Sequence, residues 1–406
     1  MRVIVVSDSA RISGGAEKVA LTSAIALARA GVKVHAFCGT GPKDDRLEGV
    51  ENLDVTVTGH LPFYENPNRL QGIRQILWNS DARHEFGQLL SKHDSSDTVV
   101  HFHCYLRVHS ASVLDVALDL GFPVVVTLHD YGLACPNMGF YNYRTREVCT
   151  LNPMSVECVR TQCTVKGRLN KLGFVARGAI LQTAVRWNRR IRHFVAVSGI
   201  SGEIMRPFLA KDAEVHLLLN PVDLEKSDPV NVAANERLLF VGKLDHQKDP
   251  VRLAQAARVV GMPVTFVGDG PLMDEVKVAN PDAHVTGWVT PNEVREHQRS
   301  ARALVMTSRW YEAAPLVIFD ALAAGLPVVV PDICAGREFI EHGKTGFIYD
   351  SKKPDGLETV LERLKDRDLV AAMGREAFER FWQDPPTMAK HVENLKRLYA
   401  DILKHP

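Results

Sequence analysis

The chain contains 406 residues, 46% of them hydrophobic and 24% charged, and its formal net charge is +1. This composition is typical of a globular protein with room for two domains, and the small net charge gives no argument for a nucleic-acid partner. No stretch of eighteen apolar residues occurs and the first apolar run is too short for a signal peptide, so we expect no membrane span and a cytoplasmic location.

The first half of the chain alternates short apolar runs with helical patterns. Residues 16–30 follow a helical spacing that Gly31 ends, and residues 69–90 predict an amphipathic helix. Runs rich in β-branched residues predict buried parallel strands at residues 3–6, 34–37, 55–57, 98–102 and 124–128. Strands that alternate with helices indicate an α/β fold with a parallel sheet.

A pair of glycines, Gly14 and Gly15, lies between the first predicted strand and the first predicted helix. Glycine lets the backbone turn tightly and approach a ligand closely. The loop is not a GxGxxG fingerprint, so by itself it is a weak indication of a phosphate-binding loop.

Histidines stand at the ends of two predicted strands. One strand ends at His101 and His103, and another leads into His129 and Asp130. The carboxyl ends of parallel strands face the ligand crevice of an open α/β sheet. We interpret His101 as a polar side chain that fills space, and His129 as a functional residue whose ring Asp130 orients.

Four of the seven cysteines lie within 29 residues, at Cys135, Cys149, Cys158 and Cys163. Their spacing contains no C-x2-C pair, so the indication of zinc is weaker than in a zinc ribbon. A disulfide is not expected in the cytoplasm. Two interpretations stay open, a structural zinc site and buried or loop thiols.

Residues 165–193 carry eight Lys or Arg, no acid and several interspersed apolar side chains. A basic amphipathic stretch can lie on an anionic membrane surface. The alternatives are a solvated helix face or a rim that faces phosphates. A peripheral contact with the inner face of the membrane therefore stays open; the cations are Lys166, Arg168, Lys171, Arg177, Arg186, Arg189, Arg190 and Arg192.

The second half repeats the alternation after a polar linker at residues 225–236. Residues 386–403 predict a long amphipathic final helix. Apolar runs predict further strands at residues 238–241, 264–267, 303–306 and 328–330. The sequence thus predicts two doubly wound, Rossmann-like domains.

Two lysines, Lys243 and Lys248, flank the turn that follows the strand at residues 238–241. Their charge fits a diphosphate, and an enzyme without a metal ion needs cations there to stabilise the leaving group. We interpret both lysines as ligands of a diphosphate.

The segment 308–331 reads as strand end, loop, helix and strand, with Glu312 in its loop and Pro315 at the helix start. The open N–H groups and the positive end of the helix dipole favour a phosphate at the first turn, Pro315, Leu316 and Val317. Asp320 follows Glu312 by eight residues. Two acids around such an end suit a ligand with hydroxyl groups on both sides of a diphosphate, as in a nucleotide sugar.

These motifs resemble the retaining glycosyltransferases of family four, which have the GT-B fold. In their E-x7-E region the first Glu lies by the donor sugar and the second binds the ribose, which implies these roles for Glu312 and Asp320. The chain departs from the family pattern at Asp320, at Lys243 in place of Arg in G-R-L…K-G, and at Pro221 in place of Gly in N-G-V-D.

The resemblance covers most of the chain and implies two domains with a cleft between them that binds the donor. It implies that residues 1–197 form an acceptor-side domain, that residues 198–385 form a donor domain, and that residues 386–406 cross back to the first domain. The segment TLHDYGLACPN resembles a version of the family in which His129 lies beside the donor sugar, and the glycine loop resembles the one that approaches the donor diphosphate.

The implied reaction moves a sugar from a nucleotide-diphosphate donor to a glycan or lipid-linked acceptor with retention, in polysaccharide or glycoconjugate synthesis. It needs no cofactor. No enzyme nucleophile is evident, and in the family's favoured account the leaving phosphate itself takes the acceptor proton. Two alternatives stay open: a nucleotide-sugar epimerase of the same fold, or an inactive nucleotide-sugar-binding scaffold.

Overall fold

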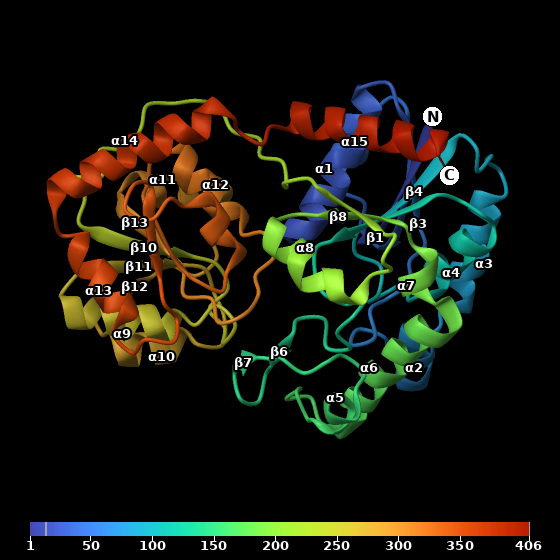
Figure 1. Ribbon diagram of the computed structural model, residues 1–406, viewed down its shortest axis with the longest axis horizontal. Coiled ribbons are helices and arrows are strands. Elements are labelled where there is room, and N and C mark those ends of the chain that lie inside the picture. Colours follow the sequence, from blue (N-terminus) through green and yellow to red (C-terminus); the bar gives the residue numbers. More distant parts are fainter. Residues whose placement is uncertain (13, 406) are drawn as a thin grey trace. The chain divides into compact units, whose positions relative to one another are not determined.

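The computed structural model describes residues 1–12 and 14–405, so Ser13 of the glycine loop and Pro406 lie outside the described residues. The chain divides into two compact units, each built on its own parallel sheet (Figure 1). Unit 1 comprises Met1–Phe140, Thr150–Pro221 and Pro386–Pro406; unit 2 comprises Tyr141–Cys149 and Val222–Pro385. The predicted α/β class with two doubly wound sheets is confirmed.

Seven parallel strands form the sheet of unit 1, in the order β3-β2-β1-β4-β5-β8-β9. The central strands β4 and β5 are buried at every position, as expected where helices cover both faces of a parallel sheet. The strands are β1 (Arg2–Ser9), β2 (Lys33–Thr40), β3 (Leu53–Val57), β4 (Thr98–Phe102), β5 (Val124–Leu128), β8 (His193–Ala196) and β9 (Glu214–Leu217).

The helices of unit 1 mostly follow the predicted pattern, but the single helix predicted at residues 69–90 is wrong. It is split at Asn79, whose side chain accepts the N–H of Ala82 and so starts a new helix. The α-helices are α1 (Gly15–Arg29), α2 (Arg69–Leu77), α3 (Ser80–Leu90), α4 (Ser112–Asp119), α5 (Val156–Arg160), α6 (Arg168–Ile180), α7 (Trp187–Arg190), α8 (Gly199–Met205) and α15 (Met388–Lys404). Short turns at Asp45–Leu47, Leu181–Val185 and Arg206–Phe208 complete the unit.

The last helix, α15, belongs to unit 1 although it follows unit 2 in the chain (red in Figure 1). Its apolar face packs with α1 and the sheet in one buried cluster. Two of its polar side chains form hydrogen bonds within the same unit: His391 Nε2 lies 3.0 Å from Ser23 Oγ, and Tyr399 Oη lies 2.6 Å from His101 Nδ1. Within the described residues, no helix is both long enough and apolar enough to cross a bilayer.

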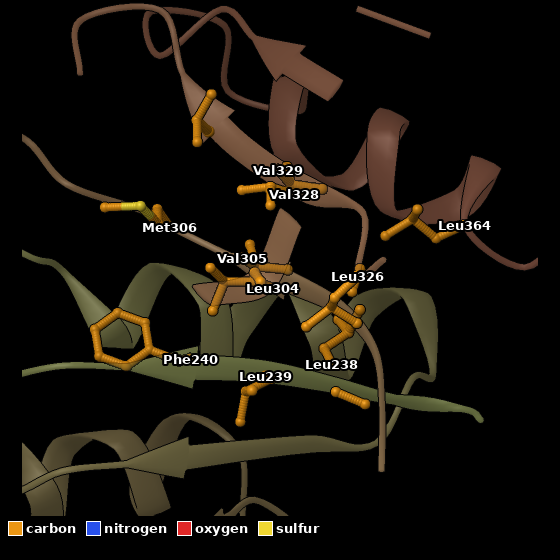
Figure 2. Close-up of a cluster of buried hydrophobic side chains, with 14 of the residues drawn as sticks. Leu238, Leu239, Phe240, Leu304, Val305, Met306, Leu326, Val328, Val329 and Leu364 are labelled. Atoms are coloured by element: carbon orange, nitrogen blue, oxygen red, sulfur yellow. The ribbon is translucent and has the colours of Figure 1, made fainter. Parts of the chain in front are cut away.

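Six parallel strands form the sheet of unit 2, in the order β12-β11-β10-β13-β14-β15. Its core contains Phe240 of β10, Val305 of β13 and Val329 of β14, as Figure 2 shows. The strands are β10 (Arg237–Val241), β11 (Val264–Val267), β12 (His284–Val285), β13 (Ala301–Val305), β14 (Val328–Pro331) and β15 (Gly346–Tyr349). The helices are α9 (Pro250–Val260), α10 (Met273–Ala279), α11 (Pro291–Arg299), α12 (Leu316–Ala323), α13 (Gly356–Arg363) and α14 (Arg367–Gln383), with a short turn at Ala335–Phe339.

The observed units differ in two ways from the expected domains, which divide between residues 197 and 198. Unit 1 extends to Pro221, because β9 pairs with β8 and continues the first sheet. In addition, a short hairpin of β6 (Tyr141–Asn142) and β7 (Glu147–Val148) belongs to unit 2, although its sequence lies within the first half of the chain. The hydroxyl of Tyr141 donates to the carbonyl of His246 in unit 2, at 3.1 Å. This contact joins residues 105 positions apart, so no local sequence pattern predicts it.

Candidate active site

Glu312 and Lys248 form a buried ion pair in unit 2. Lys248 Nζ lies 2.6 Å from Glu312 Oε1, and Ser308 Oγ donates to Glu312 Oε2 at 2.6 Å. Glu312 is only 9% exposed. Burial lowers the pKa of Lys248, but the Glu312 carboxylate outweighs this effect and holds the pKa above its ordinary value. Lys248 is therefore a cation held in one position, and the ion pair that it forms with Glu312 has no net charge.

The turn after β10 holds Lys248 in place. The Asp245 carboxylate accepts the backbone N–H groups of Gln247 and Lys248, at 3.1 and 3.2 Å. The Thr307 hydroxyl donates to the carbonyls of Lys248 and Asp249, which ties the turn to the end of β13. Lys243 differs from Lys248, because its side chain is 66% exposed and its Nζ lies 3.9 Å from Asp245. The turn thus offers one buried and one exposed cation.

Glycines let two loops of unit 2, those after β10 and β11, approach one another at the carboxyl ends of the strands. Gly242 and Gly268 have φ values of 148° and 138°, in the region that side chains rarely adopt. A Cβ atom on Gly268 would collide with the carbonyl oxygen of Gly242, and one on Gly270 with that of Leu244. The close approach of the two backbones therefore requires glycine at positions 268 and 270.

Helix α12 begins where the sequence predicts. Pro315 is its N-cap residue and supplies no side-chain hydrogen bond to the first turn. The N–H groups of the first turn have no partner inside the helix, so Leu316 and Val317 can offer theirs to an anion. Asp320 lies one turn further along and is half-buried. Glu312 therefore precedes the positive end of a helix that an anionic ligand can reach.

In unit 1, the ring of His129 is held by another histidine. His129 Nε2 lies 2.9 Å from His103 Nδ1, and the two rings stack with centroids 5.2 Å apart. Burial lowers the pKa of His129 to about 3, so the imidazole is neutral near pH 7. Sequence reasoning did not assign a role to His103; its place at the end of β4, beside β5, is the signal that could have found it. His101 fills polar space as predicted, between Tyr399 and Thr127.

The predicted role of Asp130 in orienting His129 is wrong. Its carboxylate accepts the backbone N–H of Gly132 at 2.7 Å and so shapes the loop after β5. A further acid that the sequence did not single out, Asp8 at the end of β1, accepts the N–H groups of Arg107 and Val108, both at 2.9 Å. Burial raises the pKa of both carboxyl groups. The hydrogen bonds of the two acids therefore go to backbone N–H groups of the loops after β4 and β5.

Gly14 and Gly15 lie at the start of α1, as predicted. Gly14 is the N-cap residue and Gly15 the first residue of the helix, and Gly14 makes no side-chain cap. Unlike α12, this helix has an acid in its first turn, Glu17, whose carboxylate lies close to Gly14 at the positive end of the helix.

Two of the four cysteines lie close to the same lysine in unit 1. Cys158 and Cys163 both lie against the buried amino group of Lys171, whose Nζ is 4.0 Å and 3.3 Å from the two Sγ atoms. Cys149 belongs to the segment that packs in unit 2 and Cys135 to unit 1. Because these cysteines are divided between the two units, the cysteine zinc site stays a prediction.

The basic stretch at residues 165–193 is only partly a free cationic surface. Arg190 pairs with Asp115 and Asp119 at 3.1 and 2.7 Å, and Arg177 is buried and donates to the carbonyl of Pro136. Arg192 pairs with Asp212. The acids that neutralise these cations come from other segments, so the absence of acids within the stretch did not indicate free charge.

Comparison with known proteins identifies the family. The model of Glycosyltransferase Family 4 matches residues 13–226, just over half of the chain, and the model of Glycosyl transferases group 1 matches residues 235–366. The chain belongs to Glycosyltransferase Family 4. The predicted resemblance is confirmed, and the two sheets are those of the GT-B fold.

Individual relatives of this family-four protein are distant. An Escherichia coli UDP-Gal:alpha-D-GlcNAc-diphosphoundecaprenol alpha-1,3-galactosyltransferase is 26% identical over 216 residues, covering 47% of this chain and 55% of the relative. The match thus spans about half the length of that relative. Sucrose-phosphate synthase from Thermosynechococcus elongatus has a TM-score of 0.74 at 16% identity, with both chains fully covered. Anabaena HepE in complex with UDP has a TM-score of 0.66 at 17% identity over 99% of this chain and 100% of its own.

Proposed function

We propose that this family-four protein transfers a sugar, with retention, from a nucleotide-diphosphate donor to a glycan or lipid-linked acceptor. The observation that carries the proposal is the buried Lys248–Glu312 pair beside the open start of α12. A cation and a helix start suit the diphosphate, and a carboxylate suits sugar hydroxyls. Membership of Glycosyltransferase Family 4 supports the same reaction.

The leaving group is a nucleoside diphosphate, and its negative charge grows as the glycosidic bond breaks. Lys248 is held in place by Glu312, so it stabilises this charge without first having to reorganise, and the exposed Lys243 adds a second cation at the same turn. The N–H groups of Leu316 and Val317 add the positive end of a helix dipole. No metal ion is needed for this step, because the two lysines and the helix supply the positive charge.

The sugar is positioned by hydrogen bonds. Glu312 retains acceptor capacity toward sugar hydroxyls while Ser308 and Lys248 fix its two oxygens. Asp320 accepts from the ribose hydroxyls. In unit 1, the neutral ring of His129 bonds a hydroxyl of the reacting sugar through Nδ1, because His103 occupies Nε2. The leaving phosphate takes the acceptor proton, and Gly14 and Gly15 contribute backbone N–H groups to the donor diphosphate.

The acceptor carries a lipid, and the protein meets it at a membrane surface. The support is an exposed apolar group on and beside α6: Val165, Leu169 and Leu172 are 70%, 85% and 64% exposed. The exposed cations Lys166 and Arg168 lie beside them in sequence. Apolar side chains flanked by cations suit an anionic bilayer. The name of the E. coli relative includes a lipid diphosphate acceptor, which agrees with this proposal.

The test is transfer itself, followed by nuclear magnetic resonance. The purified protein is incubated with UDP- and GDP-linked sugars and with lipid-linked or free glycan acceptors. We expect a product whose anomeric configuration equals that of the donor. An inverted product would contradict the proposed mechanism. Donor conversion to its epimer without transfer would favour the epimerase, and tight donor binding with neither reaction would favour an inactive scaffold.

A further inference from the structure

A second group of ligand-bearing side chains lies at the amino ends of β8 and β9, in unit 1. His193 begins β8 and is paired in register with Glu214, which begins β9. His216 follows Glu214 by two residues. Paired residues, and residues two apart on a strand, point to the same face of a sheet. The three side chains therefore share one face, at the edge strand of the sheet.

The three side chains converge, yet they are not satisfied by one another. Glu214 Oε2 lies 3.7 Å from His193 Nδ1 and 3.5 Å from His216 Nε2, both too long for a good hydrogen bond. These two ring nitrogens are buried and have no hydrogen-bond partner among the described residues. Two buried ring nitrogens therefore face one carboxylate oxygen without a good hydrogen bond to it.

The surrounding charge favours a cation. The hollow over the three side chains is also lined by the end of α15, including Asn394, Arg397, Asp401 and His405. The one arginine in this lining is paired with Glu393 at 3.0 Å. Asp401 adds a second acid to that of Glu214. Asp401 itself lies 3.9 Å from Lys404 Nζ, so the Glu214 carboxylate is the acid of this lining that faces the two histidines directly.

We propose that His193, Glu214 and His216 bind a zinc ion. Zinc takes imidazole nitrogen and carboxylate oxygen at about 2.0–2.1 Å, which in a tetrahedron places ligand atoms about 3.4 Å apart. The separations of 3.5 and 3.7 Å need only a small closure to reach that value. The three ligand atoms all lie within 4.8 Å of one another, and among the described residues this is the group that could hold a metal ion. Water, or Asp401 after a rotamer change, completes the shell.

The zinc serves the fold rather than the transfer reaction. His129 and Gly14 stand at the carboxyl ends of their strands, where ligands of open α/β sheets bind, whereas His193 and Glu214 stand at the amino ends. Glu214 and His216 belong to the edge strand, and Asp401 belongs to α15. A metal ion here fixes β9 to β8 and lies beneath the helix that returns to unit 1.

Equilibrium dialysis of the full chain against zinc chloride, with elemental analysis and a thermal scan, tests the proposal. We expect one zinc per chain and, with zinc in hundredfold excess over its dissociation constant, a rise in Tm on the order of 5 °C. Glu214→Gln and His216→Gln should each weaken binding on the order of 100-fold. Glu214 is exposed, so its substitution leaves the fold intact, and circular dichroism verifies this.

Two controls make the outcome decisive. His284→Gln changes a histidine of another pair, with His297, whose ring centroids are 6.4 Å apart, and it should bind zinc as the wild type does. Cys158→Ser with Cys163→Ser should also leave binding unchanged. The proposal is overturned if the wild type binds no zinc, if Glu214→Gln and His216→Gln bind it as tightly as the wild type, or if the cysteine variant is the one that loses it.

Discussion

Replacing Glu312 by glutamine tests the pair on which the candidate site depends. The substitution keeps the shape of the side chain and its hydrogen bond with Ser308, but it removes the charge that faces Lys248. The two side chains are 11% and 22% exposed, and their charged atoms lie 2.6 Å apart. Breaking a buried ion pair costs about 3–5 kcal/mol, and the partial exposure of Lys248 lowers this to about 2–3 kcal/mol.

For a unit of this size, each kcal/mol lowers the midpoint of unfolding by about 2–4 °C. We therefore expect Glu312→Gln to lower the Tm of unit 2 by about 4–12 °C. A nucleoside diphosphate brings negative charge back to Lys248, so UDP or GDP should bind this variant as tightly as the wild type or up to about tenfold more tightly. Transfer should nevertheless fall on the order of 100-fold, because the sugar loses its carboxylate.

Differential scanning calorimetry with and without UDP or GDP measures both effects. The matched control is Glu296→Gln, an exposed glutamate on α11 of the same unit, which should change neither stability nor binding. If Glu312→Gln unfolds at the wild-type temperature, Lys248 does not depend on Glu312. If transfer is also unchanged, the carboxylate does not touch the sugar, and the assignment fails.

Three further predictions concern unit 1. His103→Ala should lower kcat while leaving the affinity for nucleoside diphosphate unchanged, and His103→Gln should restore part of the activity, because its amide can still bond His129; equal kcat in all three proteins would rule out a positioning role. Burial lowers the pKa of His101, His109 and His129 to about 3, below the unfolded value of about 6.5. As pH falls below 6.5 only the unfolded chain takes up these protons, so the free energy of unfolding should decrease by about 1.4 kcal/mol per histidine per pH unit. Thermal scans at several pH values should therefore show a shallower dependence of Tm on pH for His109→Gln than for the wild type. An identical dependence would contradict the burial of a neutral ring. Leu169→Ser with Leu172→Ser should reduce sedimentation with anionic vesicles at low salt, whereas Val278→Ser, which changes a 79% exposed residue of unit 2, should not; a wild type that ignores such vesicles would make a free acceptor the better proposal.

Where local chemistry decides structure, the sequence was sufficient. The strands at the centre of both sheets are short β-branched runs, and the start and end of α12 at Pro315 and Gly325 follow from the missing N–H of proline and the positive φ of glycine, here 71°. The turn that carries Lys243 and Lys248 follows directly from a strand that ends at Val241, just before Gly242. Candidate residues on such turns could be named before the fold was known.

Contacts between distant segments could not be predicted. The bond between His103 and His129 requires that β4 and β5 be neighbours in register, which no single segment encodes. Arg190 looked like a free cation because Asp115 and Asp119 lie more than seventy residues away in sequence. Lys171 and Cys163 are only eight residues apart, but their contact also depends on packing, because α6 lies beside the loop after α5.

The most direct test of the central claim is titration calorimetry of the wild type and of Lys243→Ala with Lys248→Ala, using UDP and GDP. One of the two nucleotides should bind the wild type with a stoichiometry of one. The double variant should bind it on the order of 100-fold more weakly, because it loses both cations that face the diphosphate. Equal affinity in the two proteins would show that the phosphates bind elsewhere and would contradict the proposed site.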